Sequence, residues 1–418
     1  MRTIYFYILI ITNLIWISFK KPKFNRIKNQ KSLKISFLIN QEVVMTINSV
    51  LLSLCSFISA FLIVYISVPS IVNVARIKGL FDEPGLRKCH IQKVPNLGGV
   101  SIFAAIVISM GLFLNAAENR ELIYLLAAIT VMFFVGIKDD ILIIAPSKKL
   151  LGQIVSVLIL IVLGDIRFTS LHGFLGIYTI DYVSSVLLSC FVMVVIINGF
   201  NLIDGIDGLA AGIGIIVSIT FGSWFFLTGS VNYAIMCSIV AGALIAFFRF
   251  NVFGGANKIF MGDTGSLILG LIISVFVIRF NEANLLYHGP FAFQSAPAVS
   301  FGILIVPMFD TLRVVVLRLM KGQSPFRPDM NHLHHRVLKL GFTHVEATVL
   351  ISVVNILFIM LMFTLQSMSL IALMILNLTL STVLVLAMEF MIKRNFPLVR
   401  RNSSLRVETI KMGKIKSA

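Results

Sequence analysis

Charged residues are scarce in this sequence. Only 13% of its 418 residues are Asp, Glu, Lys or Arg, whereas roughly 25% is usual in a soluble domain. Hydrophobic residues make up 58%, and the mean hydropathy is +0.98. A soluble globule of this size would have too few polar side chains to cover its surface. The composition therefore excludes an ordinary cytosolic enzyme, a disordered chain and a coiled coil.

Cysteine is also scarce, with four residues that lie far apart, at Cys55, Cys89, Cys190 and Cys237. Their spacing matches neither a metal site nor a disulfide framework. The net charge of +17 could indicate a nucleic-acid partner. In a membrane protein, however, such an excess is typical of cytoplasmic loops. We therefore expect membrane lipid as a partner and no nucleic acid.

Long apolar blocks dominate the rest of the chain. Each is about 20 residues long, which is enough for a helix to cross about 30 Å of hydrocarbon. Backbone groups in lipid must be bonded within the segment, and the short alternating strands of a membrane barrel do not occur. The sequence predicts an all-α polytopic integral membrane bundle with about eleven transmembrane helices. These cover residues 47–68, 97–116, 121–138, 147–164, 183–200, 208–228, 233–250, 264–279, 299–319, 346–365 and 369–392.

The basic residues predict the orientation of these spans. If residue 47 starts outside, 24 of the 27 Lys and Arg residues after residue 45 fall on the cytoplasmic side. The three that remain outside are Arg120, Arg167 and Arg279. This is a strong positive-inside signal. It places the C-terminus in the cytoplasm and requires an odd number of spans.

Residues 1–44 do not fit this pattern. A span at 4–19, followed by seven Lys and Arg residues at 20–34, would invert the whole orientation. The segment lacks the charge-rich start and the cleavage site of a signal peptide. We expect Met45 to be the native start, 45–392 to form the membrane domain and 393–418 a basic cytoplasmic tail. A real N-terminal anchor that does not fully span is the alternative.

Acidic residues near a membrane are costly, so they are candidates for function. The acids Asp139, Asp140, Asp204, Asp207 and Asp263 fall at predicted cytoplasmic ends of spans. Adjacent carboxylates such as Asp139 and Asp140 repel each other, and the pair suits a cation such as Mg²⁺. A polar helix end that faces water would also account for this pair. A single polar cluster that faces the cytoplasm is the simplest interpretation.

The second motif repeats polar residues at every third position, at Asn198, Asn201, Asp204 and Asp207. On a helical turn this spacing puts the side chains near one face, whereas an ordinary Asx/Gly loop needs no such period. A third motif runs from Phe260 to Ser266 directly before a span. In it Asp263 is typical of a helix N-cap, which is the alternative to a functional role.

Two basic segments complete the set. The first, at 324–336, contains His332-Leu333-His334-His335 and lies close to Arg318. It favours an anion such as pyrophosphate over zinc, and a basic loop at lipid head groups is the alternative. The second is a charged loop at 82–99, in which Lys88 could bind phosphate. A positive-inside anchor would explain its charges equally well. Asp310, inside the predicted span 299–319, is the one exception to this gathering of acids at the cytoplasmic face, and a local polar contact with Thr311 or a neighbouring helix would explain it.

Together and in this order, these motifs resemble the polyprenyl-phosphate N-acetylhexosamine-1-phosphate transferases of glycosyltransferase family 4. The similarity extends over roughly residues 47–392. Ser-Pro-Phe-x-Pro-Asp before His-x-His-His is most similar to the bacterial undecaprenyl-phosphate N-acetylglucosaminyl branch. In the muramoyl-pentapeptide branch three His are consecutive, whereas here Leu333 interrupts them.

The resemblance implies a bacterial inner-membrane enzyme that opens cell-surface polysaccharide assembly. It would transfer GlcNAc-1-phosphate, or a related HexNAc-1-phosphate, from a UDP-sugar to undecaprenyl phosphate and release UMP. The implied cofactor is Mg²⁺, with Mn²⁺ as an alternative, and some relatives form homodimers. A long lipid substrate also implies an apolar groove near the cytoplasmic face.

The resemblance also implies roles for individual residues. Asp263 would bind the metal, with Asn201 or Asp204 assisting. Asp139 would orient or deprotonate the lipid phosphate, and Asp140 would support the site. Lys88 and Asn198 are further candidates for substrate binding. The groups around the uridine would be Asp204, Asp207, Asn251 and Phe260, and those at the diphosphate and sugar His332, His334, His335 and Arg318.

Several alternatives stay open from the residues. The sugar could be GlcNAc, GalNAc or a deoxy relative, and the pathway could be that of O-antigen, common antigen, teichoic acid or capsule. We favour direct attack by the lipid phosphate, with a covalent aspartyl-phosphate route as the alternative. The rival functions are a phospho-MurNAc-pentapeptide transferase, a CDP-alcohol phosphotransferase and an ion-coupled transporter. A transporter predicts acids at the membrane midplane and internal repeats, and neither pattern is present.

Overall fold

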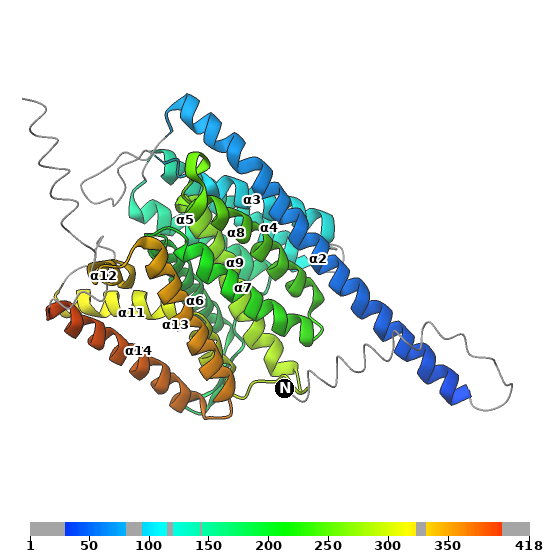
Figure 1. The fold of residues 1–418 in the computed structure, drawn as a ribbon. Helices are drawn as coiled ribbons and strands as arrows, with labels where there is room; N and C mark the ends of the chain where they lie inside the picture. Colours follow the sequence, from blue (N-terminus) through cyan, green and yellow to red (C-terminus); the bar gives the residue numbers. More distant parts are fainter. Residues whose placement is uncertain (1–29, 81–93, 115–119, 143, 323–331, 395–418) are drawn as a thin grey trace, which may run out of the picture. The chain divides into compact units, whose positions relative to one another are not determined.

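The computed structural model describes residues 30–80, 94–114, 120–142, 144–322 and 332–394, with side chains from Thr46 onward. The chain divides into two compact units, Met1–Val50 and Leu51–Ala418, and the helix bundle belongs to the second. Nearly all of the described chain is helical, which confirms the predicted all-α class (Figure 1). The helices are α2 (Gln30–Lys78), α3 (Gly98–Phe113), α4 (Arg120–Leu142), α5 (Pro146–Leu158), α6 (Tyr182–Ile203), α7 (Leu209–Leu227), α8 (Val231–Phe253), α9 (Gly262–Leu286), α10 (Ala296–Ile303), α11 (Ile305–Met320), α12 (Leu333–Lys339), α13 (His344–Thr364) and α14 (Leu370–Lys393).

Nine of the described helices are long and apolar enough to cross a membrane. One of them continues α5 into a π-helical turn, η1 (Ile159–Leu163). The pair α10 and α11 would make a tenth span, and α3, with 16 residues, is shorter than a usual span. These eleven elements follow the eleven predicted segments in order. The protein is therefore a multi-pass membrane protein.

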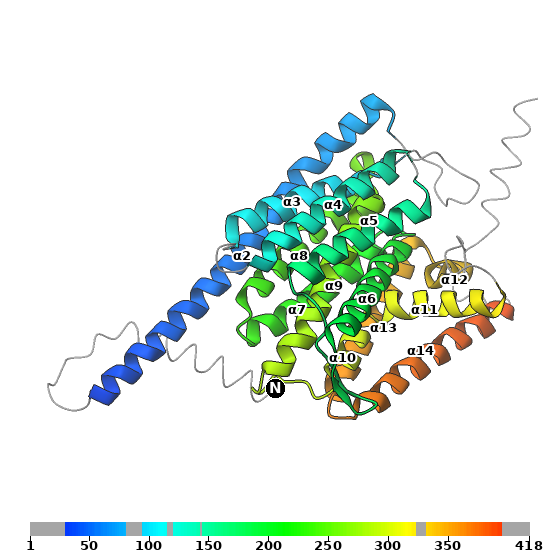
Figure 2. The same cartoon turned by 180° about the vertical axis from the view of Figure 1, so that it is seen from behind.

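Helix α9 forms the centre of the bundle (Figures 1 and 2). Its most apolar stretch is 89% buried, and it packs against α3, α4, α6, α7 and α10. Glycines let two of these neighbours approach closely. A Cβ on Gly99 would lie 2.2 Å from the backbone nitrogen of Gly265, and one on Gly136 would lie 2.4 Å from Cα of Thr264. Small residues at such contacts are typical of membrane helix packing.

The predicted span 299–319 is not one straight helix. Helices α10 and α11 meet at an angle of 86°, and Leu304 between them leaves the helical region (φ −101°, ψ 22°). Pro307 has no backbone N–H, so it cannot donate to the carbonyl of Ile303 one turn earlier. The Asn355 side chain of α13 donates to this carbonyl instead, at 3.2 Å. A partner helix therefore satisfies the freed backbone group within the bundle.

A short antiparallel hairpin joins η1 to α6. It consists of β1 (Ser170–Phe174) and β2 (Ile177–Thr179). The turn residues Leu175 and Gly176 both have positive φ, at 52° and 80°, which is typical of a tight type I′ turn. This hairpin is the only strand structure in the described ranges, and it lies in a loop that the sequence places outside.

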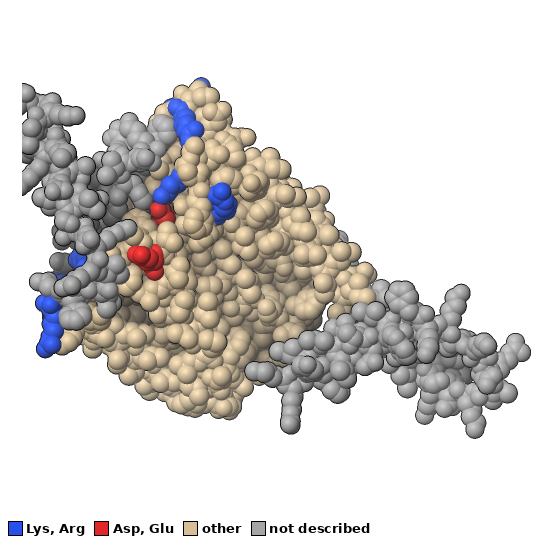
Figure 3. All heavy atoms as spheres, viewed as in Figure 1, with Lys and Arg blue, Asp and Glu red and all other residues tan. Residues whose placement is uncertain are grey.

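Large apolar side chains are exposed along most helices, for example Ile66 on α2, Phe134 on α4 and Leu187 on α6. The space-filling view shows a face almost free of charge, with the visible charged side chains gathered toward one end (Figure 3). Such an apolar surface is favourable in contact with lipid and unfavourable in contact with water.

Candidate active site

A carboxylate from α4 holds the amino end of α9. Asp140 accepts hydrogen bonds from the backbone N–H groups of Asp263 (2.7 Å) and Thr264 (3.0 Å), and from the Thr264 hydroxyl (2.5 Å). These N–H groups have no partner within the helix, and a carboxylate there is favoured by the helix dipole. Gly262 begins α9 with φ +70°, and a Cβ on it would lie 2.1 Å from the Asn96 carbonyl oxygen. Glycine is therefore required at this position.

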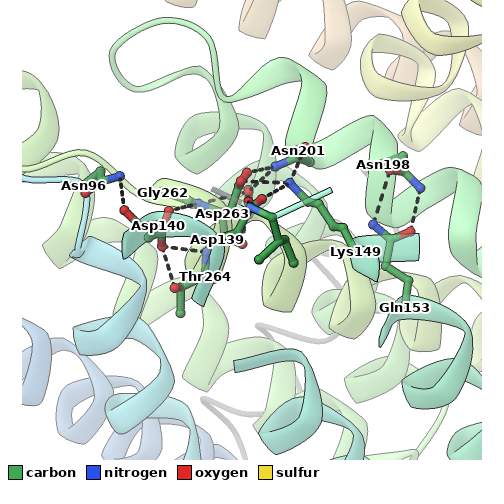
Figure 4. Close-up of polar contacts among 12 residues, drawn as sticks. Asn96, Asp139, Asp140, Lys149, Gln153, Asn198, Asn201, Gly262, Asp263 and Thr264 are labelled. Atoms are coloured by element: carbon green, nitrogen blue, oxygen red, sulfur yellow. Dashed lines mark hydrogen bonds and ion pairs between the residues drawn. The ribbon is translucent and has the colours of Figure 1, made fainter. Parts of the chain in front are cut away.

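Asp263 is not the N-cap that its sequence context suggested. The N-cap position is occupied by Met261, and Asp263 is the second residue of α9. Because Asp140 caps the helix from outside, the Asp263 side chain is released for other contacts. It points into a polar cluster built by four helices (Figure 4).

Lys149 lies at the centre of this cluster. Its Nζ is 2.8 Å from Oδ2 of Asp263 on α9 and 3.0 Å from Oδ2 of Asp139 on α4. It also donates to Oδ1 of Asn201 on α6, at 3.4 Å. The Asn201 amide in turn donates to Oδ1 of Asp263 (2.5 Å) and to the Ser266 hydroxyl (3.0 Å). One ammonium group thus joins α4, α5, α6 and α9.

A pair of side-chain amides connects α5 and α6 one helical turn away from the Lys149 cluster. Gln153 on α5 donates to Oδ1 of Asn198 at 3.3 Å, and Asn198 donates back to Oε1 of Gln153 at 2.8 Å. Gln153 is 1% exposed. Since Gln153 follows Lys149 by one turn, and Asn198 precedes Asn201 by nearly one turn, the pair sets how α5 and α6 face each other.

The loop between α6 and α7 carries two more acids. Burial raises the pKa of Asp204 well above its usual range, and the carboxylates of Asp263, Asp140 and Asp207 raise it further. Asp207 pairs with Lys258 at 2.6 Å and lies 3.6 Å from Nδ1 of His344. Because Asp204 lies near three other carboxylates, a cation bound there would favour its ionised form.

Two of the residues predicted at the uridine lie next to this loop. The Asn251 amide is bonded within the protein, because it accepts from the Gly208 N–H (2.6 Å) and donates to the Ile259 carbonyl (2.9 Å). It thereby fixes the turn at Gly208, which has φ +80°. The ring of Phe260 is half-buried, with the ammonium of Lys258 5.7 Å from its centroid. A flat ring beside a cation is a suitable surface for a planar base.

The histidines at 332–335 reach the same end of the bundle. His334 is 2% exposed, and a Cβ on Gly205 would lie 2.3 Å from its Nε2, so its ring packs directly against the α6–α7 loop. Burial, with help from His335, lowers the pKa of His334 to about 3, so the ring is neutral at pH 7. Neither of its nitrogens has a hydrogen-bond partner in the described part of the chain. A buried, unpaired imidazole is what a ligand-binding position requires.

Known proteins are similar over most of this chain. A model of glycosyl transferase family 4 matches residues 122–281. An undecaprenyl-phosphate alpha-N-acetylglucosaminyl 1-phosphate transferase of Salmonella typhi is 30% identical over 305 residues, covering 72% of this chain and 81% of its own length. The protein of the same name from Escherichia coli (strain K12) is 29% identical over 283 residues, or 67% and 75%. A decaprenyl-phosphate N-acetylglucosaminephosphotransferase of Mycobacterium tuberculosis (strain CDC 1551 / Oshkosh) is 31% identical over 323 residues, or 70% and 78%.

The chain belongs to glycosyl transferase family 4. The matched segment, 122–281, runs from α4 to α9 and includes the whole cluster around Lys149. The histidine segment lies beyond it in sequence and joins it in space through Gly205. The resemblance drawn from the motifs is therefore confirmed at the level of the family.

The structure brings together most of the predicted site residues. Asp139, Asn201 and Asp263 all contact Lys149. Asp140 bonds the backbone at the start of α9, next to them. Arg318 is 6% exposed, two turns after Asp310 on α11. Lys88 lies outside the described residues. Which of these side chains touch substrate stays a prediction.

Sequence patterns do not single out Lys149 or Gln153. In the sequence, Lys149 is one of the basic residues that predict the cytoplasmic side, although it lies inside the predicted span 147–164. Asp310 is expected to make a local polar contact, and its contacts with Arg313 and His332 agree with this expectation. A charged residue at membrane depth is a signal for function by itself. Applied to lysine as strictly as to aspartate, that rule would have found the centre of the site.

Proposed function

We propose that the protein transfers a HexNAc-1-phosphate, with GlcNAc-1-phosphate as the first candidate, from a UDP-sugar to undecaprenyl phosphate and releases UMP. The observation that carries the proposal is the convergence of Asp139, Asn201 and Asp263 on Lys149 in a family 4 chain. Such a transfer brings two anionic phosphate substrates together, and a cluster of carboxylates with a cation at its centre suits that task.

The donor set fits a divalent cation. Among the described residues, no three Asp, Glu, His or Cys side chains are arranged to hold a metal ion alone. Mg²⁺ does not need such a cage, because it commonly takes one or two carboxylates and completes its shell with water and substrate phosphates. Asp263 would hold it, with Asn201 and Asp204 assisting. When bound, Mg²⁺ would neutralise the diphosphate and stabilise the departing UMP.

The chain's own residues would supply position and charge. Lys149 can exchange its contact with the carboxylates for one with phosphate oxygens, since its ammonium has three donors. Asp139, once released from Lys149, would orient the lipid phosphate. A lipid phosphate oxygen would attack the β-phosphorus as the bond between that phosphorus and the bridging oxygen breaks. The bridging oxygen would leave with UMP.

The site would face the cytoplasm of the bacterial inner membrane, and undecaprenyl phosphate would reach it laterally between helices. Lys258 and Phe260 would border the uracil, and the imidazoles of His332, His334 and His335 would contact the diphosphate or the sugar. Both ends of the donor would then lie at one end of the bundle.

The test is UMP release by membranes or purified protein, with UDP-GlcNAc, undecaprenyl phosphate and Mg²⁺. We expect release to require the lipid, to stop with EDTA, to return with added Mg²⁺ and to be lost in Asp263→Ala. A panel of UDP-sugars, including UDP-GalNAc and UDP-MurNAc-pentapeptide, would assign the donor. A folded preparation that releases no UMP from any of them would overturn the proposal.

A further inference from the structure

Asp310 is buried where the bent pair crosses the bundle, on α11. The residue is 1% exposed, and its carboxylate faces His332 and Leu333. Oδ2 lies 3.0 Å from Nδ1 of His332, while Oδ1 accepts from the backbone N–H of Leu333, also at 3.0 Å. Arg313, one turn later on α11, donates to the same Oδ1 at 3.0 Å. Both carboxylate oxygens are therefore used to hold the start of α12.

We infer that Asp310 is a positioning residue that fixes the tautomer of His332. It also docks the histidine segment, residues 332–335, against the acid loop, which is the α6–α7 loop that carries Asp204 and Asp207. The inference rests on the proposed function for its effect on turnover, but its structural half can be tested alone. No contact between Asp310 and a substrate is part of it.

The tautomer follows from hydrogen-bond chemistry. An ionised carboxylate can only accept, so Nδ1 of His332 must carry the hydrogen that lies between the two groups. In a neutral imidazole, the other nitrogen, Nε2, is then left with its lone pair. A carboxylate that holds an imidazole in this way orients the ring as well as its hydrogen, as it does for metal-binding histidines.

The effect of this contact extends to the acid loop. The rings of His332 and His334 are parallel, with 4° between their planes and 5.9 Å between their centroids. His334 packs on Gly205, which lies between Asp204 and Asp207. A substitution at Asp310 would therefore affect the acid loop through the two stacked rings, although α11 carries none of the acids at that site.

The bend of the membrane helix makes this geometry possible. A straight span would carry its middle residues deep into the bundle, whereas the 86° bend turns α11 toward α12. Arg313 balances part of the charge of Asp310, which makes a buried carboxylate tolerable. The break at Leu304 thus has a consequence for the site as well as for the backbone.

The test replaces Asp310 with Asn, which has nearly the same shape. Its oxygen can still accept from Leu333 and Arg313, but its NH₂ group would face His332 and donate to Nδ1. The imidazole must then carry its hydrogen on Nε2. We expect ¹⁵N NMR of histidine-labelled protein in nanodiscs to show this change of tautomer for one resonance, identified as His332 by its absence in His332→Ala.

For turnover, we expect Asp310→Asn to lower kcat for UMP release by about 10- to 100-fold, as loss of such an orienting carboxylate commonly does. The KM for the UDP-sugar should change much less than kcat. In a His332→Ala background the same substitution should have little further effect, because residues that act as a unit are not additive. Thr311→Val, which removes only a bond to the Pro307 carbonyl, is the matched control and should keep kcat near that of the unaltered protein.

An unchanged His332 tautomer in Asp310→Asn would overturn the inference. So would an equal loss of kcat in the presence and absence of His332, because that result indicates a structural role for Asp310. If the unaltered protein releases no UMP from any UDP-sugar, the proposed function fails, and the tautomer measurement still decides whether Asp310 controls His332.

Discussion

At the scale of single residues, Lys149 contacts side chains from three other helices of the site. Its ammonium lies within 3.0 Å of two carboxylates from different helices, and its side chain is 16% exposed. Two carboxylates at such a distance repel each other in a partly buried site, so the ammonium is needed for both to be ionised. In the proposed reaction, the same ammonium would also bind phosphate oxygens of the substrates.

We expect Lys149→Met to abolish UMP release and to destabilise the fold. Removing one partner of a buried ion pair costs about 3–5 kcal/mol, and we expect the lower end because the Asp263 side chain is 31% exposed. Thermal unfolding in detergent measures this effect. The neighbouring Lys148 is exposed, so Lys148→Met is the matched control and should leave both activity and stability nearly unchanged.

A second variant separates the two roles of Lys149. Adding Asp139→Asn to Lys149→Met removes the uncompensated repulsion, so thermal stability should recover while activity stays lost. Recovery of activity in the double variant would contradict a role for Lys149 at the phosphates.

At the scale of helices, the amide pair of Gln153 and Asn198 connects α5 to α6. We expect Gln153→Leu to cost about 1–3 kcal/mol, because the side-chain carbonyl of Asn198, which is half-buried, loses its donor. In Gln153→Leu with Asn198→Leu, both polar groups are gone, and stability should largely return. Thermal unfolding and UMP-release kinetics on the same preparations measure both effects.

The double variant also decides what Asn198 does. The structure satisfies its amide within the protein, so we expect the KM for the UDP-sugar to stay within about threefold of the unaltered value, as holds when no uniform binding contact is lost. A stable double variant with a strongly raised KM would instead show that Asn198 contacts the substrate.

The close approach of α4 to α9 is a second property of helices. In Gly136→Ala the added Cβ would lie 2.4 Å from Cα of Thr264, and overpacking of this kind costs about 1–3 kcal/mol. Because α9 begins next to this contact, UMP release should fall as well. Gly111→Ala on α3 is the matched control, since nothing lies within 4 Å of its added Cβ, and it should be neutral or stabilising by about 0.5–1 kcal/mol. Equal melting temperatures for the two variants would contradict the predicted steric contact.

At the scale of the whole molecule, the two ends of the bundle differ in charge. Lys149, Lys258 and Arg336 lie at the end that carries the acid cluster, whereas Arg167 and Arg279 lie near the hairpin at the other end, where both contact Asp165. The Lys and Arg bias of the sequence predicts that the first end faces the cytoplasm. Nucleotide sugar and acceptor phosphate would then meet on the same side.

Reporter fusions test this orientation. A fluorescent protein after Ala418 should be fluorescent, and alkaline phosphatase inserted at Gly176, in the hairpin turn, should be active, because that enzyme needs the oxidising side of the membrane. The reverse pattern would invert the predicted topology and place the acid cluster outside.

Much of the fold follows from the sequence. The positions of the spans depend on hydropathy over about 20 residues, and lipid forces each such segment to bond its own backbone. The bend at Leu304 is different. Pro307 permits it, but a hydrogen bond that the Asn355 side chain, 52 residues away, donates to the Ile303 carbonyl stabilises it. The local hydropathy pattern therefore predicts the apolar segment, but it does not predict the bend at Leu304.

The same division applies to the site. The sequence by itself determined which residues are chemically unusual for a membrane, namely the aspartates, asparagines and histidines at the ends of spans. Only the tertiary structure decided their partners: Asp140 caps a helix that begins more than 120 residues later, Lys149 joins Asp139 to Asp263, and Asp310 holds His332. The physical reason is that hydropathy and helical period act within a segment, whereas hydrogen bonds and ion pairs are decided by which faces of distant helices come to lie together.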